Sequence, residues 1–82
     1  MNDSIIIEKI KLVIKEELSL EHISDSASQD NVPQWDSMAF MSIVAKLEDT
    51  FGILVTADNV VLFDSIEKIF GEIKRQLSCK ES

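Results

Sequence analysis

Residues 36–52 decide the fold, and they read Asp-Ser-Met-Ala-Phe-Met-Ser-Ile-Val-Ala-Lys-Leu-Glu-Asp-Thr-Phe-Gly. The large apolar residues of this stretch recur every three or four positions, as Phe40, Ile43, Val44, Leu47 and Phe51. This spacing puts them on one face of a helix, because an α-helix makes one turn in 3.6 residues. Asp36 can cap the start, and Gly52 occupies the usual position after the last turn. The stretch therefore predicts an amphipathic helix.

Two further stretches predict amphipathic helices of the same kind. In residues 4–18 the apolar stripe comprises Ile7, Ile10, Ile14 and Leu18, with Ile6 and Val13 beside it. Asp3 or Ser4 can cap the start of that helix. After Asp64, which forms a capping-box spacing with Glu67, the stripe comprises Ile66, Ile69, Phe70, Ile73 and Leu77. Three such helices suffice for a small all-α bundle around one core.

The segment between the first two helices predicts a long loop. Residues 19–36 are rich in Ser, Asp, Asn and Gln and show no apolar period. Loops of this length in small domains often carry function. We expect Ile23, Val32 and Trp35 to anchor this one to the core.

The segment before the last helix is ambiguous. Residues 53–63 are rich in β-branched residues and fit a β-hairpin, although an isolated hairpin is only marginally stable. They fit a short helix over residues 57–62, capped by Thr56, equally well. The pattern alone leaves both readings open.

Size and composition limit the class of protein. The 82 residues fit a single domain spanning residues 1–82, and 45% of them are hydrophobic, which is enough for one core. Cys79 is the only cysteine, so no internal disulfide can form. The N-terminus does not resemble a signal peptide, and no apolar run is long enough to span a bilayer. We therefore expect a cytoplasmic protein that does not insert into membranes.

The net charge of -7 is unevenly distributed. Residues 16–67 contain eleven acids and one base, whereas the two flanking segments are slightly basic. An acidic surface repels nucleic acids and anionic membranes and attracts basic protein surfaces. It can equally serve only to keep a small protein soluble.

Residues that could carry catalysis are scarce. His22 is the only histidine, and it lies 57 positions from Cys79, which gives no metal-ligand spacing. The sequence also lacks a glycine-rich phosphate loop and a calcium-binding loop. The sequence therefore predicts neither an enzyme nor a metal protein.

The junction Trp35-Asp36-Ser37-Met38 is the most informative local feature. If Asp36 caps the helix, Ser37 becomes its first residue, with its hydroxyl at an exposed helix end beside unpaired backbone amides. A phosphate on Ser37 would meet those amides and the positive end of the helix dipole, although Asp36 would partly oppose it. Serine is also common at helix starts, and this chain has ten serines. Spacing alone therefore makes Ser37 one candidate among several.

Asp36-Ser37-Met38 resembles the Asp-Ser-Leu motif of the acyl and peptidyl carrier protein family. The similarity extends along the following helix, whose Leu47-Glu48-Asp49-Thr50-Phe51 resembles the Leu-Glu-Glu-x-Phe end of the family's second helix. The stretch through Asp64-Ser65-Ile66 resembles the family's short third helix and the opening of its fourth. The resemblance covers nearly the whole chain and is most specific over residues 32–70. It implies a small four-helix bundle, with three main helices, one short helix and a long first loop, and it favours helix for the ambiguous segment.

The resemblance also implies a function. A phosphopantetheinyl transferase would move a 4'-phosphopantetheine arm from coenzyme A onto Ser37, with Asp36 as the motif neighbour. The arm would carry acyl or aminoacyl groups as thioesters for partner enzymes that load, modify and transfer them, while the carrier catalyses nothing. The family's partner face corresponds here to Met38, Met41, Ala45, Glu48 and Asp49, which would meet basic docking patches. We expect the carrier to be a monomer.

Some positions depart from the pattern of fatty-acid carriers. Ala39 and Ser42 stand where acids are usual in the second helix, and Val61 and Leu62 stand where the third helix is commonly acidic. These departures favour a carrier for one pathway, such as polyketide, nonribosomal peptide, aminoacyl or surface-polysaccharide biosynthesis, over general fatty acid biosynthesis. The alternative is a small acidic helical adaptor that binds proteins and carries no prosthetic group.

Overall fold

The computed structural model describes residues 2–81, with side chains described through residue 78. The elements follow in the order α1 (Asp3–Leu18), α2 (Ser37–Phe51), η1 (Val60–Asp64) and α3 (Ile66–Glu81), where η1 is a 3-10 helix. Over this range the only β-type pairing is an isolated bridge between Ser28 and Ser65. The predicted all-α class is confirmed, whereas the short fourth element is a 3-10 helix and not a fourth α-helix.

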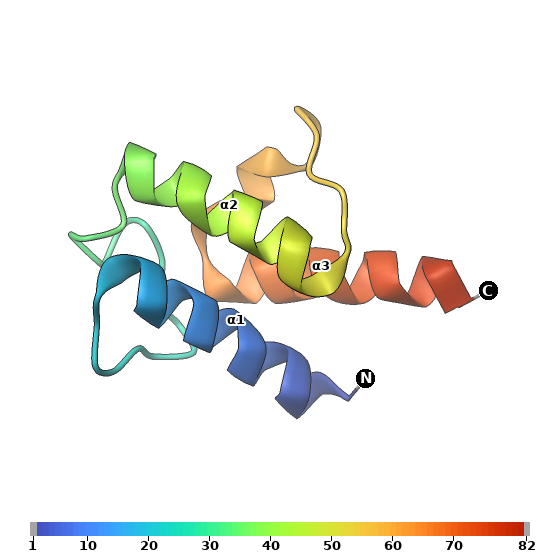
Figure 1. Ribbon diagram of the computed structural model, residues 1–82, viewed down its shortest axis with the longest axis horizontal. Helices are drawn as coiled ribbons and strands as arrows, with labels where there is room; N and C mark the ends of the chain where they lie inside the picture. Colours follow the sequence, from blue (N-terminus) through green and yellow to red (C-terminus); the bar gives the residue numbers. More distant parts are fainter. Residues whose placement is uncertain (1, 82) are drawn as a thin grey trace.

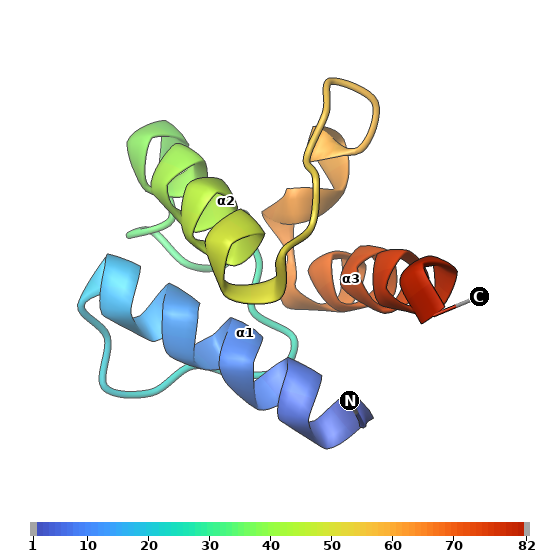
Figure 2. The ribbon, with the colours of Figure 1, turned by 45° about the vertical axis from the view of Figure 1, so that its right-hand side comes forward.

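The helices surround one core. α1 packs against both α2 and α3, and η1 packs against α3 and α2. In Figure 1, α1 and α2 run in opposite directions on one side of the molecule, and α3 crosses behind them. In Figure 2, η1 occupies the space between α2 and α3. This arrangement leaves one long side of α1 and one long side of α2 facing solvent.

The core is built mainly from the predicted apolar stripes, with further members from the long loop, the segment after Gly52 and η1. Its buried hydrophobic members are Ile6, Ile10, Val13, Ile14, Leu18, Ala27, Trp35, Ile43, Val44, Leu47, Phe51, Ile53, Phe63, Ile66, Ile69 and Ile73. Phe40, expected in the core, is only half-buried. On α1 the buried face is centred nearer to Ile6 and Val13 than predicted, and Ile7 is half-buried. The buried face differs from the predicted stripe because α1 contacts two helices. The side of α1 that faces α2 is therefore buried as well.

The helix ends differ from prediction by one or two residues. Asn2, and not Asp3 or Ser4, caps α1, since Asn2 Oδ1 accepts a hydrogen bond from the Ile5 amide at 2.9 Å. At α3 the residue before the helix is Ser65, whose Oγ accepts from the Lys68 amide at 3.2 Å. The expected capping box from Asp64 is therefore wrong, because Asp64 still belongs to η1. Gly52 ends α2 in the left-handed conformation, as predicted, with φ of 66°.

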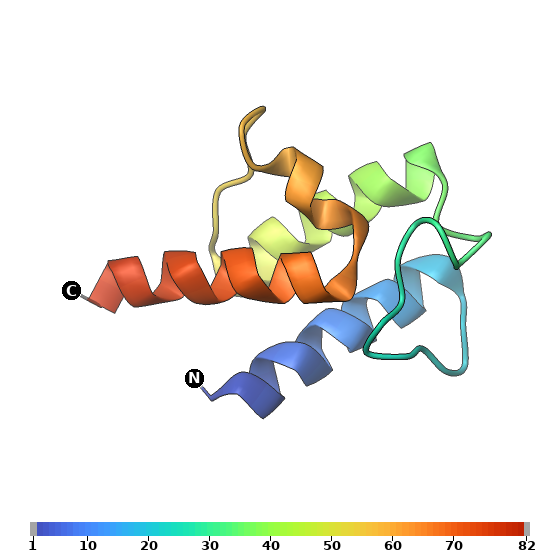
Figure 3. The same cartoon turned by 180° about the vertical axis from the view of Figure 1, so that it is seen from behind.

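The long loop runs from the end of α1 to the start of α2, and on the way it contacts the start of α3. Figure 3 shows residues 19–36 passing beside the junction of η1 and α3. Two backbone hydrogen bonds fix this approach, from the Gln29 amide to the Asp64 carbonyl at 2.7 Å and from the Ile66 amide to the Ala27 carbonyl at 3.0 Å. Trp35 is buried, and Ile23 and Val32 pack partly buried against the core, as expected.

The hairpin reading of residues 53–63 is wrong. Residues 57–59 form a turn, and the 3-10 helix begins at Val60, later than the helix expected over residues 57–62. Thr56 does cap the turn, since its Oγ1 accepts from the Asp58 amide at 3.3 Å. Phe63 is buried at the end of η1, which explains why the segment turns toward the core.

Candidate functional site

The start of α2 is a fixed junction with an exposed serine. Trp35 is only 1% exposed, and its amide donates to the Val32 carbonyl at 3.0 Å, so the chain is anchored just before the helix. Asp36 lies in the cap position, where its Oδ1 accepts from the Ala39 amide at 2.9 Å. Ser37 follows as the first helical residue and is exposed. The predicted cap and the predicted position of Ser37 agree with this geometry.

The polar groups around Ser37 make this helix end available to an anionic substituent. The Asp36 side chain is engaged with Ala39, and the Phe40 amide donates to the Asp36 carbonyl at 2.8 Å. The amides of Ser37 and Met38 have no acceptor in the preceding turn, because a helix leaves its first amides unpaired. A phosphate ester at the Ser37 hydroxyl would lie near these donors and the positive end of the helix dipole.

The outer side of α2 continues from Ser37 as an apolar and acidic surface. Met38 is 83% exposed and Met41 is 62% exposed. Ala45 and Asp49 are exposed on the same side of the helix. Two methionines that are mostly exposed suit contact with differently shaped surfaces, because their side chains are flexible and polarizable.

Glu48 differs from the other residues assigned to this side. It is half-buried, and its Oε2 accepts a hydrogen bond from the Val55 amide at 3.0 Å. The carboxylate therefore ties the segment after Gly52 back to α2. Helical spacing could not predict this contact, since the backbone donor lies beyond the helix and seven residues away.

The 3-10 helix η1 also has an exposed apolar side chain, on an element that contacts α2. Val61 is 66% exposed, whereas Leu62 is half-buried and packs against the core. Both residues stand where the family's third helix is commonly acidic, and of the two only Val61 is exposed. Since η1 contacts α2, Val61 lies on an element adjoining the exposed side of that helix.

A buried carboxylate organises the segment that links α2 to η1. Glu72 of α3 is 5% exposed, and Arg75 donates to it from Nε at 2.9 Å and from Nη2 at 2.6 Å. Asn59 Nδ2 and Gln76 Nε2 also donate to Glu72 Oε2, at 3.0 and 2.8 Å. Hydrogen bonding from Arg75 outweighs the desolvation and lowers the pKa of Glu72 to about 2. We call Asn59, Glu72, Arg75 and Gln76 the Glu72 network.

The Glu72 network holds the backbone of residues 54–56. The Gln76 side-chain amide pairs with both backbone groups of Leu54, accepting from its amide at 3.0 Å and donating to its carbonyl at 2.8 Å. Asn59 also donates to the Leu54 carbonyl, at 3.1 Å, and accepts from the Thr56 amide at 2.6 Å. The network thus fixes the position from which η1 starts. Sequence reasoning missed it, and the only available signal was that Glu72 and Gln76 lie one turn apart beside the apolar stripe.

The residues considered for catalysis are not brought together in the described part of the chain. His22 is exposed in the long loop, and the side chain of Cys79 lies outside the described residues. Within residues 2–81, His, Cys, Asp and Glu side chains form no group of three that could hold a metal ion. None of the helices in that range has the length and apolarity to cross a bilayer.

Comparisons with known proteins identify no family for this chain. No protein-family model matches the chain, and no curated protein matches it.

Proposed function

We propose that this chain is a carrier protein that holds acyl or aminoacyl groups as thioesters on a 4'-phosphopantetheine arm attached to Ser37. The observation that carries the proposal is the exposed Ser37 in an Asp-Ser-Met motif at the start of α2, behind an anchored Trp35 and a capping Asp36. A serine in this position is accessible to a transferase and held at a fixed place on the surface.

The proposal extends to the finer fold. η1 occupies the place in chain order of the family's short third helix, so the molecule would be the carrier-type four-helix bundle with that helix in the 3-10 form. Residues 19–36 would be the long first loop. Partner enzymes with basic patches would meet the exposed side of α2, through Met38, Met41, Ala45 and Asp49. The cytoplasm, where coenzyme A is available, would be the site of loading.

The pathway is proposed from the departures in α2 and η1. Ala39 is half-buried and Ser42 is exposed, so the first turns of α2 lack acids on their surface. Val61 adds an exposed apolar side chain where an acid is usual. These features support a carrier dedicated to one biosynthetic pathway and its own partners.

The alternative is a protein-binding adaptor without a prosthetic group. It is favoured by one observation, the exposure of Met38, Met41, Leu54 and Val61 on a domain of this size, since exposed apolar surface often marks protein contacts. A carrier has the same need for contact surface, so exposure alone does not separate the two functions.

Intact-mass measurement separates them. The unmodified protein is incubated with a broad-specificity phosphopantetheinyl transferase, coenzyme A and magnesium. We expect a gain of one phosphopantetheine, lost in Ser37→Ala and retained in Ser42→Ala, which removes an exposed hydroxyl from the same helix. No gain in the wild-type protein would favour the adaptor, and a gain that persists in Ser37→Ala would place the arm elsewhere.

A further inference from the structure

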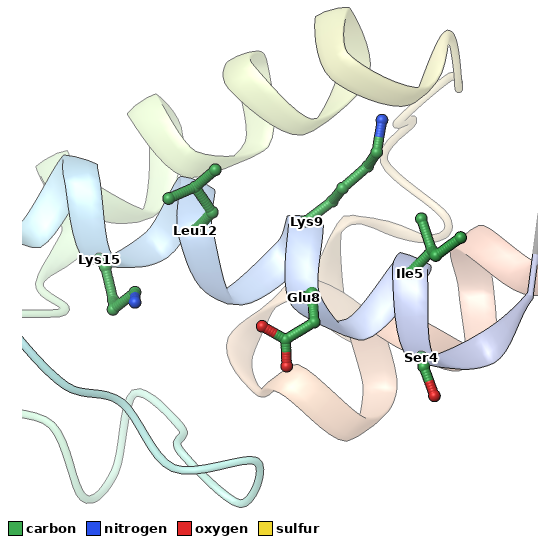
Figure 4. Close-up of a pocket in the computed structure, with 6 residues that line it drawn as sticks. All are labelled: Ser4, Ile5, Glu8, Lys9, Leu12 and Lys15. Carbon is green, nitrogen blue, oxygen red and sulfur yellow. The ribbon is translucent and has the colours of Figure 1, made fainter.

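The outer side of α1 carries an apolar patch that is left exposed by the part of the chain that the structure describes. Ile5 is 44% exposed and Leu12 is 52% exposed, and the seven residues between them correspond to two turns on one face. A shallow groove of about 360 Å³ runs along this face (Figure 4); it is lined by Ser4, Ile5, Glu8, Lys9, Leu12 and Lys15. We call the surface formed by Ile5, Glu8, Lys9, Leu12, Lys15 and Glu16 the α1 outer face.

Charged residues border the two apolar side chains on both edges. Figure 4 shows Lys9 rising on the side of Leu12 and Ile5, and Glu8 and Lys15 extending the opposite way. Because seven residues bring a helix back to the same side, Glu16 lies on the edge of Lys9, and Lys15 lies on the edge of Glu8. Each edge therefore carries one acid and one base, two turns apart.

Within the described part of the chain, none of these four charges lies within ion-pair distance of an opposite charge, and Glu8 attracts Lys11 only from beyond that distance. The ion pairs there join Lys11 to Asp25, Lys68 to Asp64, Lys74 to Asp3 and Arg75 to Glu72. The α1 outer face is also neutral, with two acids and two bases, in a chain of net charge -7. It is thus a surface at which a second acidic copy would meet no local excess of like charge.

Two-fold symmetry makes this charge pattern complementary to itself. When two helices pack antiparallel about a two-fold axis, each edge meets the same edge of the other helix running in reverse. With the axis at Leu12, Glu8 meets Lys15 of the second copy, and Lys9 meets Glu16 of the second copy. Each of these pairs forms twice, around a central contact between the two Leu12 side chains.

We propose that the α1 outer face is a self-docking surface on which a second copy of this chain packs its own α1 antiparallel about Leu12. The patch offers two large apolar side chains per copy, so the interface lies below the roughly 1,200 Å² of a stable complex. The pairing is weak and depends on concentration, and dilute protein stays monomeric. The inference does not rest on modification of Ser37.

Charge complementation tests the proposal. Lys9→Glu/Lys15→Glu makes both edges acidic, and Glu8→Lys/Glu16→Lys makes both edges basic. We expect wild-type protein to self-associate at millimolar concentration in sedimentation equilibrium, and each variant alone to associate at least about tenfold more weakly. An equimolar mixture of the two variants should recover affinity to within about threefold of wild type.

The mixture is informative because the net charges of the two variants oppose their association. Each pair of substitutions changes the net charge of -7 by four, so the variants carry -11 and -3 and still repel each other at a distance. Recovery in the mixture therefore reports local pairing on the α1 outer face. A mixture no tighter than the variants alone, or a wild-type protein that stays monomeric at millimolar concentration, would overturn the proposal.

Two further variants locate and orient the contact. Leu12→Asn should abolish association, whereas Leu54→Asn, which removes a similarly exposed side chain elsewhere, should retain it; the reverse result contradicts the proposed surface. In a Cys79→Ser background, Leu12→Cys should oxidise to a covalent dimer and Ile5→Cys should not. A ready Ile5→Cys dimer would mean a parallel pair and would refute the antiparallel arrangement.

Discussion

Ser19 ends α1 in a conformation that glycine adopts more easily. Its φ of 57° and ψ of 44° are left-handed, which costs an L-residue about 1–2 kcal/mol. Its amide bonds to the Glu16 carbonyl and the Leu20 amide to the Lys15 carbonyl, so the helix end itself holds this geometry. Ser19→Gly should therefore raise the free energy of unfolding in urea by about 1 kcal/mol. Ser42→Gly, at an exposed position inside α2, should lower it by about 0.5 kcal/mol, because glycine is a weaker helix former than serine. A loss of stability in Ser19→Gly would mean that the backbone strain there is negligible.

Glu72 should make stability depend on pH in a defined window. Its pKa lies at about 2 in the folded chain, below the ordinary 4.5 of an unfolded glutamate. Folding therefore favours the ionised form, and the contribution is full above pH 4.5 and is lost as the pH falls from 4.5 toward 2. At neutral pH, Glu72→Gln should lower the free energy of unfolding by about 1–3 kcal/mol, since hydrogen bonds to a charged group are replaced by neutral ones.

The control for this residue is Glu17→Gln, an exposed glutamate near the end of α1, which should change stability by less than about 0.5 kcal/mol. Urea unfolding of wild type and Glu72→Gln across the acid range gives the measurement. The difference between the two proteins should shrink as the pH decreases through the window. A difference that stays constant with pH would show that Glu72 acts through shape and not through charge.

At the scale of elements, the helices were predictable because each encodes its own buried face. Residues 36–52 carry a cap, an apolar stripe and a terminating Gly52, and α2 forms between those signals. Helix ends were less predictable, because neighbouring polar residues compete for the same amides. Asn2 and Ser65 cap α1 and α3, although Asp3, Ser4 and Asp64 fit the spacing as well. Which of these residues caps the helix depends on the backbone conformation of the segment that precedes it.

The linking segment could not be predicted from local pattern. Its β-branched residues favour strand, yet side chains hold residues 54–56: Glu48 of α2, Gln76 of α3 and Asn59, which directly precedes η1. Such hydrogen bonds come from up to 22 positions away in the sequence, as for Gln76 and Leu54. Tertiary contacts thus override local β-propensity, which is itself strongly dependent on context.

Removing the Asn59 side chain should therefore loosen this segment locally. Asn59→Ala eliminates bonds to the Thr56 amide, the Leu54 carbonyl and Glu72. Hydrogen exchange at residues 54–56 should accelerate by about tenfold or more, while the amides of α1 keep their protection. Asp58→Ala, which alters an exposed neighbour, should change neither. Equal acceleration throughout the chain would indicate global destabilisation and not a local role.

The exposed side of α2 leads to a prediction about docking. Met41→Asp introduces a charge at an exposed side chain, so helical circular dichroism should be unchanged. If this side meets the transferase, the rate of Ser37 modification should fall about tenfold, since aspartate would replace an apolar contact and would lose its hydration in the interface. Ser42→Asp adds the same charge one position away and should have a smaller effect. A loss of helical signal in Met41→Asp would instead assign Met41 to the packing of the domain.

For the whole molecule, the position of the candidate site was predictable from the sequence, but the complete set of residues that form it was not. The sequence places Ser37 at the start of a helix, and the structure puts it on the surface there with Asp36 as the cap. Glu48 was expected on the partner face of the same helix, and the structure uses its carboxylate to hold the Val55 amide. Spacing gives the side of a helix on which a residue lies, whereas the engagement of its polar atoms depends on chain segments that pass nearby.

The acidic surface should make the stability of the whole domain depend on salt. Eleven acids and one base fall in residues 16–67, and compacting these charges costs self-repulsion that counterions screen. Salt also weakens ion pairs, which would lower stability. The Arg75–Glu72 pair should lose little in this way, because the Glu72 side chain is buried and salt screens such a pair less. Raising sodium chloride from low to near-molar concentration should therefore increase the melting temperature, by about 5 °C for a gain of about 1 kcal/mol. Asp30→Asn, at an exposed loop acid, should already be more stable at low salt and should gain less from added salt. A melting temperature that falls with salt would mean that ion pairs, and not repulsion among the acids, dominate the electrostatics of this fold.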